Sequence, residues 1–184
     1  MNDDAKTRAW PGDATPAQRL AEILRVDHAG EYGAVRIYEG QLTILGRSAA
    51  APAIRRMMEQ ERAHLRAFET MLPAGRVRPT LLTPLWHVAG FALGAGTALM
   101  GEKAAMACTA AVEEVIDAHY AAQVEELAGS DPELAQQLEG FRREEVEHRD
   151  EALAAGARET PGYEPLAAAI KAGSRLAIWL STRI

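Results

Sequence analysis

The chain has 184 residues, enough for one domain with a full hydrophobic core and too few for two sizeable domains. Its 26 acidic and 20 basic side chains give a formal net charge of −6, and without a basic run this argues against nucleic acid as the main ligand. A single cysteine, Cys108, excludes an internal disulfide framework and a cysteine-based zinc or iron–sulfur site. We therefore expect a buried, unreactive thiol in a reducing compartment.

The composition favours an all-α protein. Alanine occurs 37 times, about one residue in five, whereas aromatic residues make up only 5% of the chain. Alanine is the strongest helix former, and sheet cores are built from β-branched and aromatic side chains.

Helix start and stop signals divide the chain into an acidic N-terminal tail and a series of helices. Residues 15–18 (TPAQ) combine an N-cap threonine, a proline at the first helical position and a glutamine three residues on, as in a capping box. Residues 130–133 (SDPE) form a similar start. We predict a flexible tail over 1–14 and a single domain over 15–184, with helices at 15–46, 52–72, 97–127, 131–158 and 164–181.

Residues 79–101 form an uncharged stretch of 23 residues, which is long enough to be a membrane candidate. Pro84, His87 and several glycines weaken a membrane-spanning interpretation. Three alternatives remain open for this segment: contact with a membrane interface, a crossover helix in the protein core, and an oligomer interface.

A repeat of chemically active residues runs through the predicted helices. Glu31 is followed seven residues later by Tyr38, and Glu113 is followed seven residues later by Tyr120, so each pair lies nearly on one helix face. Downstream of each glutamate lies one of the two Glu-x-x-His motifs of the chain, which are Glu61 with His64 and Glu145 with His148. All six glutamates and histidines fall near the middle of their helices, so antiparallel packing would bring them to one level of a bundle.

This set of residues predicts a dinuclear metal site. Residues three apart on a helix project to the same side, so each Glu-x-x-His motif can present a carboxylate and an imidazole to one metal ion. The two single glutamates then bridge the ions or complete their coordination. A glutamate from each of two helices and a Glu-x-x-His motif from each of two others is the ligand set of ferritin-like di-iron and di-manganese bundles. The expected ligands are Glu31, Glu61, His64, Glu113, Glu145 and His148.

Neighbouring polar residues have competing interpretations. The helical phase of Tyr120 favours Glu113 over the adjacent Glu114 as the ligand, and Glu144, Glu147 and Glu151 are expected to face solvent. Asp27 and Asp117 lie one turn from Glu31 and Glu113, where each could orient a histidine or remain an ordinary surface residue. Tyr38 and Tyr120 could donate to the cluster or simply fill the core, and Tyr120 is the candidate catalytic residue. His28, His87 and His119 are taken as local polar residues, with His119 also a candidate near the mouth of the site.

The chain resembles the demethoxyubiquinone hydroxylases of ubiquinone biosynthesis over about residues 16–184. The motifs that carry this resemblance are DHAGEYGA at 27–34, RIY at 36–38, ACT at 107–109, VEE at 112–114, HY at 119–120, EEVEH at 144–148 and RLAIWLS at 175–181. The metal ligands that the resemblance implies are the same six residues.

The resemblance implies a ferritin-like di-iron monooxygenase that uses O₂ to hydroxylate the ring of a polyprenylated methoxy-benzoquinol. It also implies two iron ions per chain, NADH or another reductant as the electron source, and ubiquinone-biosynthesis proteins as partners. The chain lacks the targeting extension of mitochondrial members, so we expect a bacterial protein on the cytoplasmic face of the inner membrane.

A membrane crossing at 79–101 would separate the first three ligands from the last three, so we expect this segment to lie in the interface as a monotopic helix. It could also mediate homo-oligomer formation. Two other functions compete with the hydroxylase: an iron-oxidising or storage protein, which would share the ligands, and a non-enzymatic lipid-binding scaffold, which would share the apolar segment.

Overall fold

The computed structural model describes residues 14–184, and within them every regular element is a helix. The helices are α1 (Pro16–Leu45), α2 (Ala51–Ala74), α3 (Thr83–Leu99), α4 (Glu102–Leu127), α5 (Pro132–Ala154), a short 3₁₀ helix (Ala157–Glu159) and α6 (Tyr163–Arg183). The all-α prediction is confirmed. The tail predicted over 1–14 lies outside the described residues except for Ala14, and the division into one domain remains a prediction.

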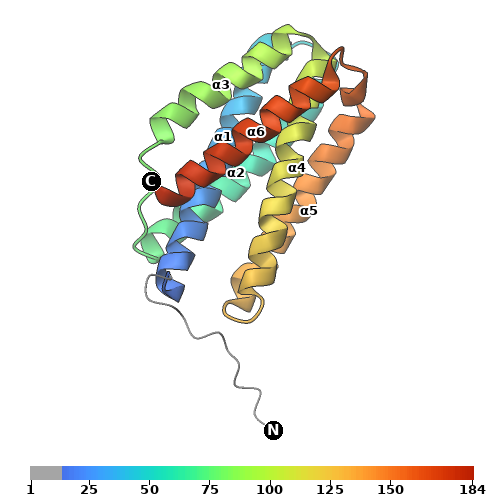
Figure 1. Cartoon of the computed structure of the whole chain (residues 1–184). Coiled ribbons are helices and arrows are strands. Elements are labelled where there is room, and N and C mark those ends of the chain that lie inside the picture. The colour runs from blue at the N-terminus through green and yellow to red at the C-terminus, as the bar shows by residue number, and fades with distance from the viewer. Residues whose placement is uncertain (1–13) are drawn as a thin grey trace.

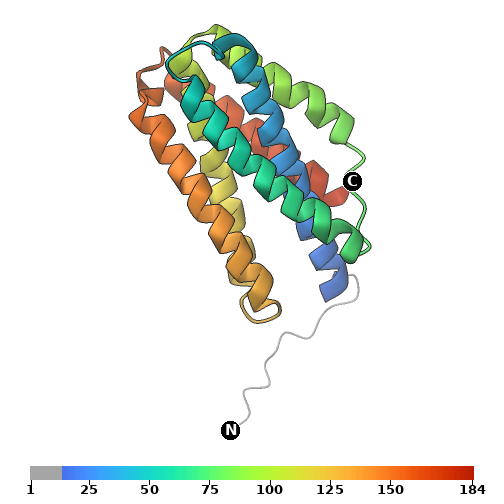
Figure 2. The same ribbon diagram turned by 180° about the vertical axis from the view of Figure 1, so that it is seen from behind.

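Four helices form a ferritin-like bundle, and the other two cover one face of it (Figure 1). The hairpin of α1 and α2 lies beside the hairpin of α4 and α5, while α3 carries the chain back along the bundle between them. Seen from behind, α2 and α5 form the face opposite to α3 and α6 (Figure 2). Because of this long crossover, both hairpins bring their helix centres to the same level.

The start of α1 follows the predicted capping box. The Thr15 side chain accepts a hydrogen bond from the Gln18 backbone N–H, and the Gln18 side chain accepts one from the Thr15 N–H. At the other end, Gly46 caps the helix as expected.

Three predicted helix boundaries are wrong. Helix α2 continues through Pro73 to Ala74, because the Gly75 N–H still donates to the Met71 carbonyl and closes the last turn. The helix predicted from residue 97 begins only at Glu102, since Gly101 has a φ of 111° and separates α3 from α4. The helix predicted to reach residue 158 stops at Ala154, ahead of Gly156 with a φ of 89°.

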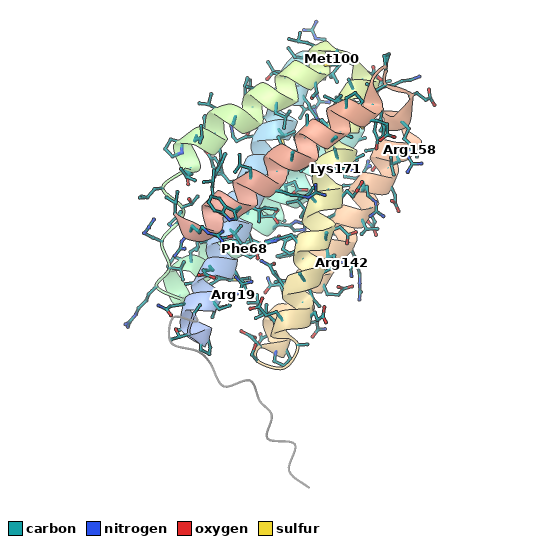
Figure 3. All side chains as sticks on the ribbon, in the orientation of Figure 1. Arg19, Phe68, Met100, Arg142, Arg158 and Lys171 are labelled. Carbon is teal, nitrogen blue, oxygen red and sulfur yellow. The ribbon has the colours of Figure 1, made fainter. Side chains whose placement is uncertain are left out.

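Helix α3 packs on α1 through glycines. A Cβ atom at Gly94 would lie 1.9 Å from the Ile37 carbonyl oxygen, and one at Gly90 would lie 2.9 Å from the Gly33 carbonyl oxygen. These contacts place one face of the apolar segment against the bundle, as the crossover interpretation required. The opposite face leaves the apolar side chains of Leu85, Val88 and Leu99 exposed to solvent. Met100, the residue after the last turn of α3, is also exposed and is labelled in Figure 3.

No helix within residues 14–184 combines the length and the apolar character needed to cross a membrane.

Candidate metal centre

The six predicted ligands come together in the middle of the bundle, and each side chain is at most 3% exposed. Glu31 comes from α1, Glu113 from α4, and the two Glu-x-x-His motifs come from α2 and α5. These side chains form two groups in which one ligand atom per residue lies within 4.8 Å of the others. The first group is Glu31, Glu61, His64 and Glu145, and the second is Glu61, Glu113, Glu145 and His148.

Glu61 and Glu145 belong to both groups, so they lie between the two positions that metal ions could take. Glu31 belongs only to the first group and Glu113 only to the second. The sequence left open whether the single glutamates bridge the ions or complete their coordination. The grouping favours the second alternative, in which Glu31 and Glu113 each complete the coordination of one ion.

Both histidines direct the Nδ1 atom toward the carboxylates. His64 Nδ1 lies 3.4 Å from Glu31 Oε2 and 3.2 Å from Glu145 Oε1. His148 Nδ1 lies 3.0 Å from Glu61 Oε1 and 3.4 Å from Glu145 Oε2. Each Nδ1 atom therefore lies within 3.4 Å of oxygens from two carboxylates of its group.

Several of these buried atoms have no hydrogen-bond partner. They are Glu31 Oε2, Glu61 Oε1, His64 Nδ1, both carboxylate oxygens of Glu145 and His148 Nδ1. A buried polar atom without a partner costs about 1–3 kcal/mol, and four buried carboxylates also repel one another. Two divalent cations would remove both penalties, so the buried oxygens and imidazole nitrogens fit a dinuclear metal site.

The protonation of the cluster reflects this crowding. Burial, with repulsion from neighbouring carboxylates, raises the pKa of Glu61 and of Glu113 well above the usual range. Burial also acts on Glu145, but its contacts with His148 and His64 outweigh it and lower the pKa of Glu145 to about 2. Similarly, Glu145 and Glu31 outweigh burial at His64 and raise its pKa to about 10. Without metal the cluster therefore keeps protons that bound cations would displace.

Two buried tyrosines hold the single glutamates. Tyr38 Oη donates to Glu113 Oε1 at 2.8 Å, and Tyr120 Oη donates to Glu31 Oε1. Each tyrosine thus lies on the helix of one glutamate but binds the other. The two roles considered for Tyr38 and Tyr120 therefore coexist. Both side chains are buried in the core, and both donate to a carboxylate of the cluster.

The remaining aspartates and histidines singled out in the sequence do not contact the two histidines of the cluster. Asp27 Oδ1 accepts hydrogen bonds from His119 and Gln123, while Asp117 pairs with Arg142 and Arg149, so neither aspartate contacts a histidine of the cluster. His87 Nδ1 lies 2.6 Å from the Tyr32 hydroxyl. His28 is buried, and burial lowers its pKa.

The acidic neighbours of the ligands behave differently from one another. Glu114 is exposed and pairs with Lys171, Glu147 is exposed, and Glu151 pairs with Arg56. Glu144 was expected to face solvent only, but its carboxylate lies 3.3 Å from His64 Nε2. In the sequence, only the position of Glu144 directly before the Glu-x-x-His motif, one turn from His148, pointed to a role near the cluster. The contact with His64 depends on how α2 and α5 face each other.

An apolar cavity of about 420 Å³ lies between α1, α3, α4 and α6, and none of the six predicted ligands lines it. Its wall includes Gly30 and Gly33 beside Glu31, Val112 and Ile116 near Glu113, and residues of α6 such as Leu176. Ile116 also packs against the apolar cluster that contains Tyr120. The sequence did not predict this cavity, because it arises from the way α6 covers the bundle.

The fold and the cluster together define a class of protein, the ferritin-like bundles whose carboxylates and histidines are suited to hold two metal ions. Residues 18–181 match the family described as ubiquinone biosynthesis protein COQ7. The chain belongs to this family.

Individual relatives agree with the family match. The 3-demethoxyubiquinol 3-hydroxylase of Rhodospirillum rubrum is 57% identical over 175 residues, covering 95% of this chain and 82% of that protein. The human mitochondrial NADPH-dependent 3-demethoxyubiquinone 3-hydroxylase is 53% identical over 166 residues, covering 88% and 76%. The mitochondrial 5-demethoxyubiquinone hydroxylase of Saccharomyces cerevisiae is 40% identical over 205 residues, covering 98% and 88%. The resemblance noted in the sequence is therefore confirmed.

Proposed function

We propose that this protein is the O₂-dependent hydroxylase that acts on the ring of a polyprenylated methoxy-benzoquinol, demethoxyubiquinol, in ubiquinone biosynthesis. The observation that carries the proposal is the buried cluster of four glutamates and two histidines, in a chain that is 57% identical to a 3-demethoxyubiquinol 3-hydroxylase.

The proposed ligands of two iron ions are the six residues of the cluster. His64 and Glu31 would hold one ion, His148 and Glu113 the other, and Glu61 and Glu145 would lie between them. When bound, the iron pair supplies the activation of O₂ and the transfer of one oxygen atom to the ring. The protein contributes the geometry, because all six side chains are fixed on the middle turns of four packed helices.

The two tyrosines would keep the terminal carboxylates in place during turnover. Tyr38 Oη donates to Glu113 and Tyr120 Oη to Glu31, so neither carboxylate is free to rotate away from its ion. Burial, with the charge of the neighbouring carboxylates, raises the pKa of both hydroxyls well above the usual range, so each keeps its proton. For Tyr120, the candidate catalytic residue, this supports a role as a hydrogen-bond donor at the cluster.

The apolar cavity would receive the quinol. Its wall is made of small and apolar side chains, and it lies against the α1 and α4 residues that flank Glu31 and Glu113. A benzoquinol ring with a prenyl tail is largely apolar and matches this lining.

We further propose that α3 and α6 rest on the membrane that contains the quinol, on the cytoplasmic face of a bacterial inner membrane. Exposed apolar side chains gather on both helices, with Leu85, Val88 and Leu99 on α3 and Leu176 and Trp179 on α6. Both helices also line the cavity, so a substrate tail could pass from the bilayer to the cavity. A second copy of the chain or another ubiquinone-biosynthesis protein on this face is the competing occupant.

The membrane contact is tested with vesicles. Leu93 lines the cavity, so the exposed pair Val88 and Leu99 is the better target. Replacing both with serine should release the protein from vesicles, because each apolar side chain contributes about 1.5–3 kcal/mol when buried. Unchanged vesicle binding together with loss of a dimer in solution would assign this face to a second copy of the chain.

The electron donor is proposed to be a reduced nicotinamide nucleotide. The family resemblance implies NADH, whereas the human relative is named as NADPH-dependent. Parallel assays with NADH and NADPH would identify which nucleotide supports turnover.

The reaction itself is tested with labelled oxygen. Diferrous protein supplied with a prenylated demethoxyubiquinol and ¹⁸O₂ should yield a product with one labelled oxygen atom on the ring. An iron-storage protein would consume O₂ and leave the quinol unlabelled, and a lipid-binding scaffold would consume no O₂. Rapid O₂ uptake without labelled product in the presence of reductant would replace the hydroxylase with iron oxidation as the function.

A further inference from the structure

The residue before the glutamate of each Glu-x-x-His motif is polar and takes part in a contact between α2 and α5. Gln60 precedes Glu61 on α2, and Glu144 precedes Glu145 on α5. The Gln60 side-chain Nε2 donates to Glu144 Oε2 at 3.1 Å. This bond joins the two motif-bearing helices directly beside the metal centre.

Each member of the Gln60–Glu144 pair also contacts the histidine of the opposite helix. His148 Nε2 on α5 lies 3.0 Å from Gln60 Oε1, and His64 Nε2 on α2 lies 3.3 Å from Glu144 Oε2. Three consecutive hydrogen bonds therefore connect the two imidazole rings along the side that faces away from the carboxylate cluster.

The direction of these bonds follows from the chemistry of the groups. The Glu144 carboxylate can only accept, so His64 Nε2 and Gln60 Nε2 must both donate to it. Since the Gln60 amide nitrogen faces Glu144, its oxygen faces His148 and can only accept there. Both histidines are then protonated on Nε2, which in a neutral imidazole leaves the lone pair on Nδ1.

The Nδ1 atoms are the ones that face the carboxylates and have no hydrogen-bond partner. The orientation of His64 is restricted further by Phe141, whose ring centroid lies 4.2 Å from that of the imidazole. Metal-binding histidines elsewhere commonly donate their second ring N–H to a carboxylate or carbonyl, which fixes the tautomer and the ring orientation.

We propose that Gln60 and Glu144 act as one positioning unit that sets the tautomer and orientation of both histidines, so that Nδ1 of each binds metal. This inference rests on the proposed dinuclear site, because it concerns how the chain prepares its own ligands. Gln60 and Glu144 are positioning residues that act through His148 and His64.

The test measures iron release. Iron-loaded protein is mixed with excess ferrous chelator, and the release rate is compared among wild type, Glu144→Leu and Gln60→Leu. Both variants should release iron about 10- to 100-fold faster, the usual effect of removing a hydrogen-bond partner of a metal-binding histidine. Glu144→Gln keeps an oxygen that can accept both bonds, so it should restore most of the wild-type rate.

The matched control is Glu147→Leu, which removes an exposed glutamate from the same helix and should leave the release rate within about twofold of wild type. Circular dichroism checks that every variant keeps its helices. The double variant Glu144→Leu/Gln60→Leu should release iron more slowly than the product of the two single effects predicts, because Gln60 is oriented by Glu144.

A second measurement follows the rings themselves. In zinc-loaded protein with ¹⁵N-labelled histidine, Glu144→Leu should mainly perturb the Nε2–H signal of His64, and Gln60→Leu that of His148. A purely structural effect would move both signals equally in either variant.

Three results would overturn the proposal: equal release rates for Glu144→Leu and Glu147→Leu, a Glu144→Gln variant as impaired as Glu144→Leu, or single effects that multiply exactly in the double variant. Failure of the proposed dinuclear site is distinguishable, because the wild-type protein would then hold neither iron nor zinc at the cluster. Failure of the hydroxylase function would instead appear as iron-loaded protein that leaves the quinol unlabelled.

Discussion

The hairpin of α1 and α2 and the hairpin of α4 and α5 carry the same arrangement around the proposed metal centre. Each has a single glutamate, a tyrosine seven residues later and a Glu-x-x-His motif on its second helix. The hydrogen bonds cross between the hairpins, since Tyr38 binds Glu113 and Tyr120 binds Glu31. Near the ligands, the two halves are close to symmetric.

Four residues before each single glutamate, the symmetry ends. The first half has Asp27 and the second has Thr109, and each accepts a hydrogen bond from the glutamine ten residues after the opposite glutamate. Asp27 also binds His119, whose side chain is 22% exposed, whereas Thr109 is linked only to buried groups. The two halves therefore agree at the proposed ligands and differ one turn away, where only the first half has a buried titratable side chain.

The largest effects are expected from substitutions of the proposed ligands, and these substitutions test whether the two halves are equivalent. His64→Ala and His148→Ala should each reduce turnover to less than a tenth, because either change removes one imidazole from a four-residue group. Glu145→Ala should be equally damaging. Steady-state activity and iron content measure the loss.

The controls for the ligand variants are Glu114→Ala and Glu147→Ala, which remove exposed carboxylates next to the ligands and should be nearly silent. A His64 variant with wild-type activity beside an inactive His148 variant would break the equivalence of the halves. Retention of more than about a tenth of the activity in Glu145→Ala would contradict its assignment as a ligand.

The next effect concerns the packing of α3 on α1, the first helix of the first half, which takes place at glycines of α3. Gly94→Ala should lower the free energy of unfolding by about 3 kcal/mol, because its Cβ would lie 1.9 Å from a backbone carbonyl that cannot easily move. Gly96→Ala is the control, since nothing lies within 4 Å of its Cβ, and it should stabilise α3 by about 0.5–1 kcal/mol. Urea unfolding measures both, and equal values would show that the α1–α3 packing is looser than described.

The hydrogen bonds from each tyrosine to the glutamate of the other hairpin test whether the two halves are equivalent in stability. Tyr38→Phe and Tyr120→Phe should each destabilise the metal-free protein by about 1–3 kcal/mol, because each leaves a buried carboxylate without its donor. Thermal unfolding of the two variants gives the values. If one variant is destabilised and the other is unchanged, the two hydrogen bonds are not equivalent.

The smallest effect is expected from Asp27, and its sign depends on pH. Burial raises the pKa of Asp27 despite its bonds to His119 and Gln123. The folded state therefore binds a proton that the unfolded chain has released above a pH of about 3.9, and the wild-type protein loses stability as pH rises from there through the folded-state pKa. Asp27→Asn removes this loss, so its advantage over wild type should be near zero in acid and should grow toward neutral pH.

Unfolding of metal-free protein between pH 4 and pH 8 measures this difference. The counterpart in the other half is Thr109→Val, whose hydroxyl does not titrate in this range, so its effect should be independent of pH. A pH-independent Asp27→Asn effect would show that the asymmetry between the halves is not one of charge.

Local rules predicted much of the fold and the cluster. The capping box at Thr15 and the spacing of seven residues between Glu31 and Tyr38 depend on helix geometry alone, which a sequence shows directly. The breaks at Gly101 and Gly156 were missed because a glycine can continue or end a helix, and only its backbone conformation decides. The ligand roles of the six residues remain predictions, although the side chains lie together.

Contacts between helices were harder to predict. By helical phase Glu144 points away from Glu145, and only the facing of α5 toward α2 brings it to His64. The cavity requires the position of α6 over α1 and α4, which no periodicity in residues 164–181 specifies. Tertiary packing, rather than local preference, determines both features.

The crossed hydrogen bonds have a consequence for the order in which the molecule forms. Tyr38 and Glu113 are separated by 75 residues and Tyr120 and Glu31 by 89, and both groups of candidate ligands include Glu145. Closing loops of this length carries an entropic cost that must be met before the contacts can form. During synthesis on the ribosome, neither group exists until α5 has emerged and docked. Metal binding at the proposed site would thus be a late event, and a bound ion would report that all four bundle helices have packed together.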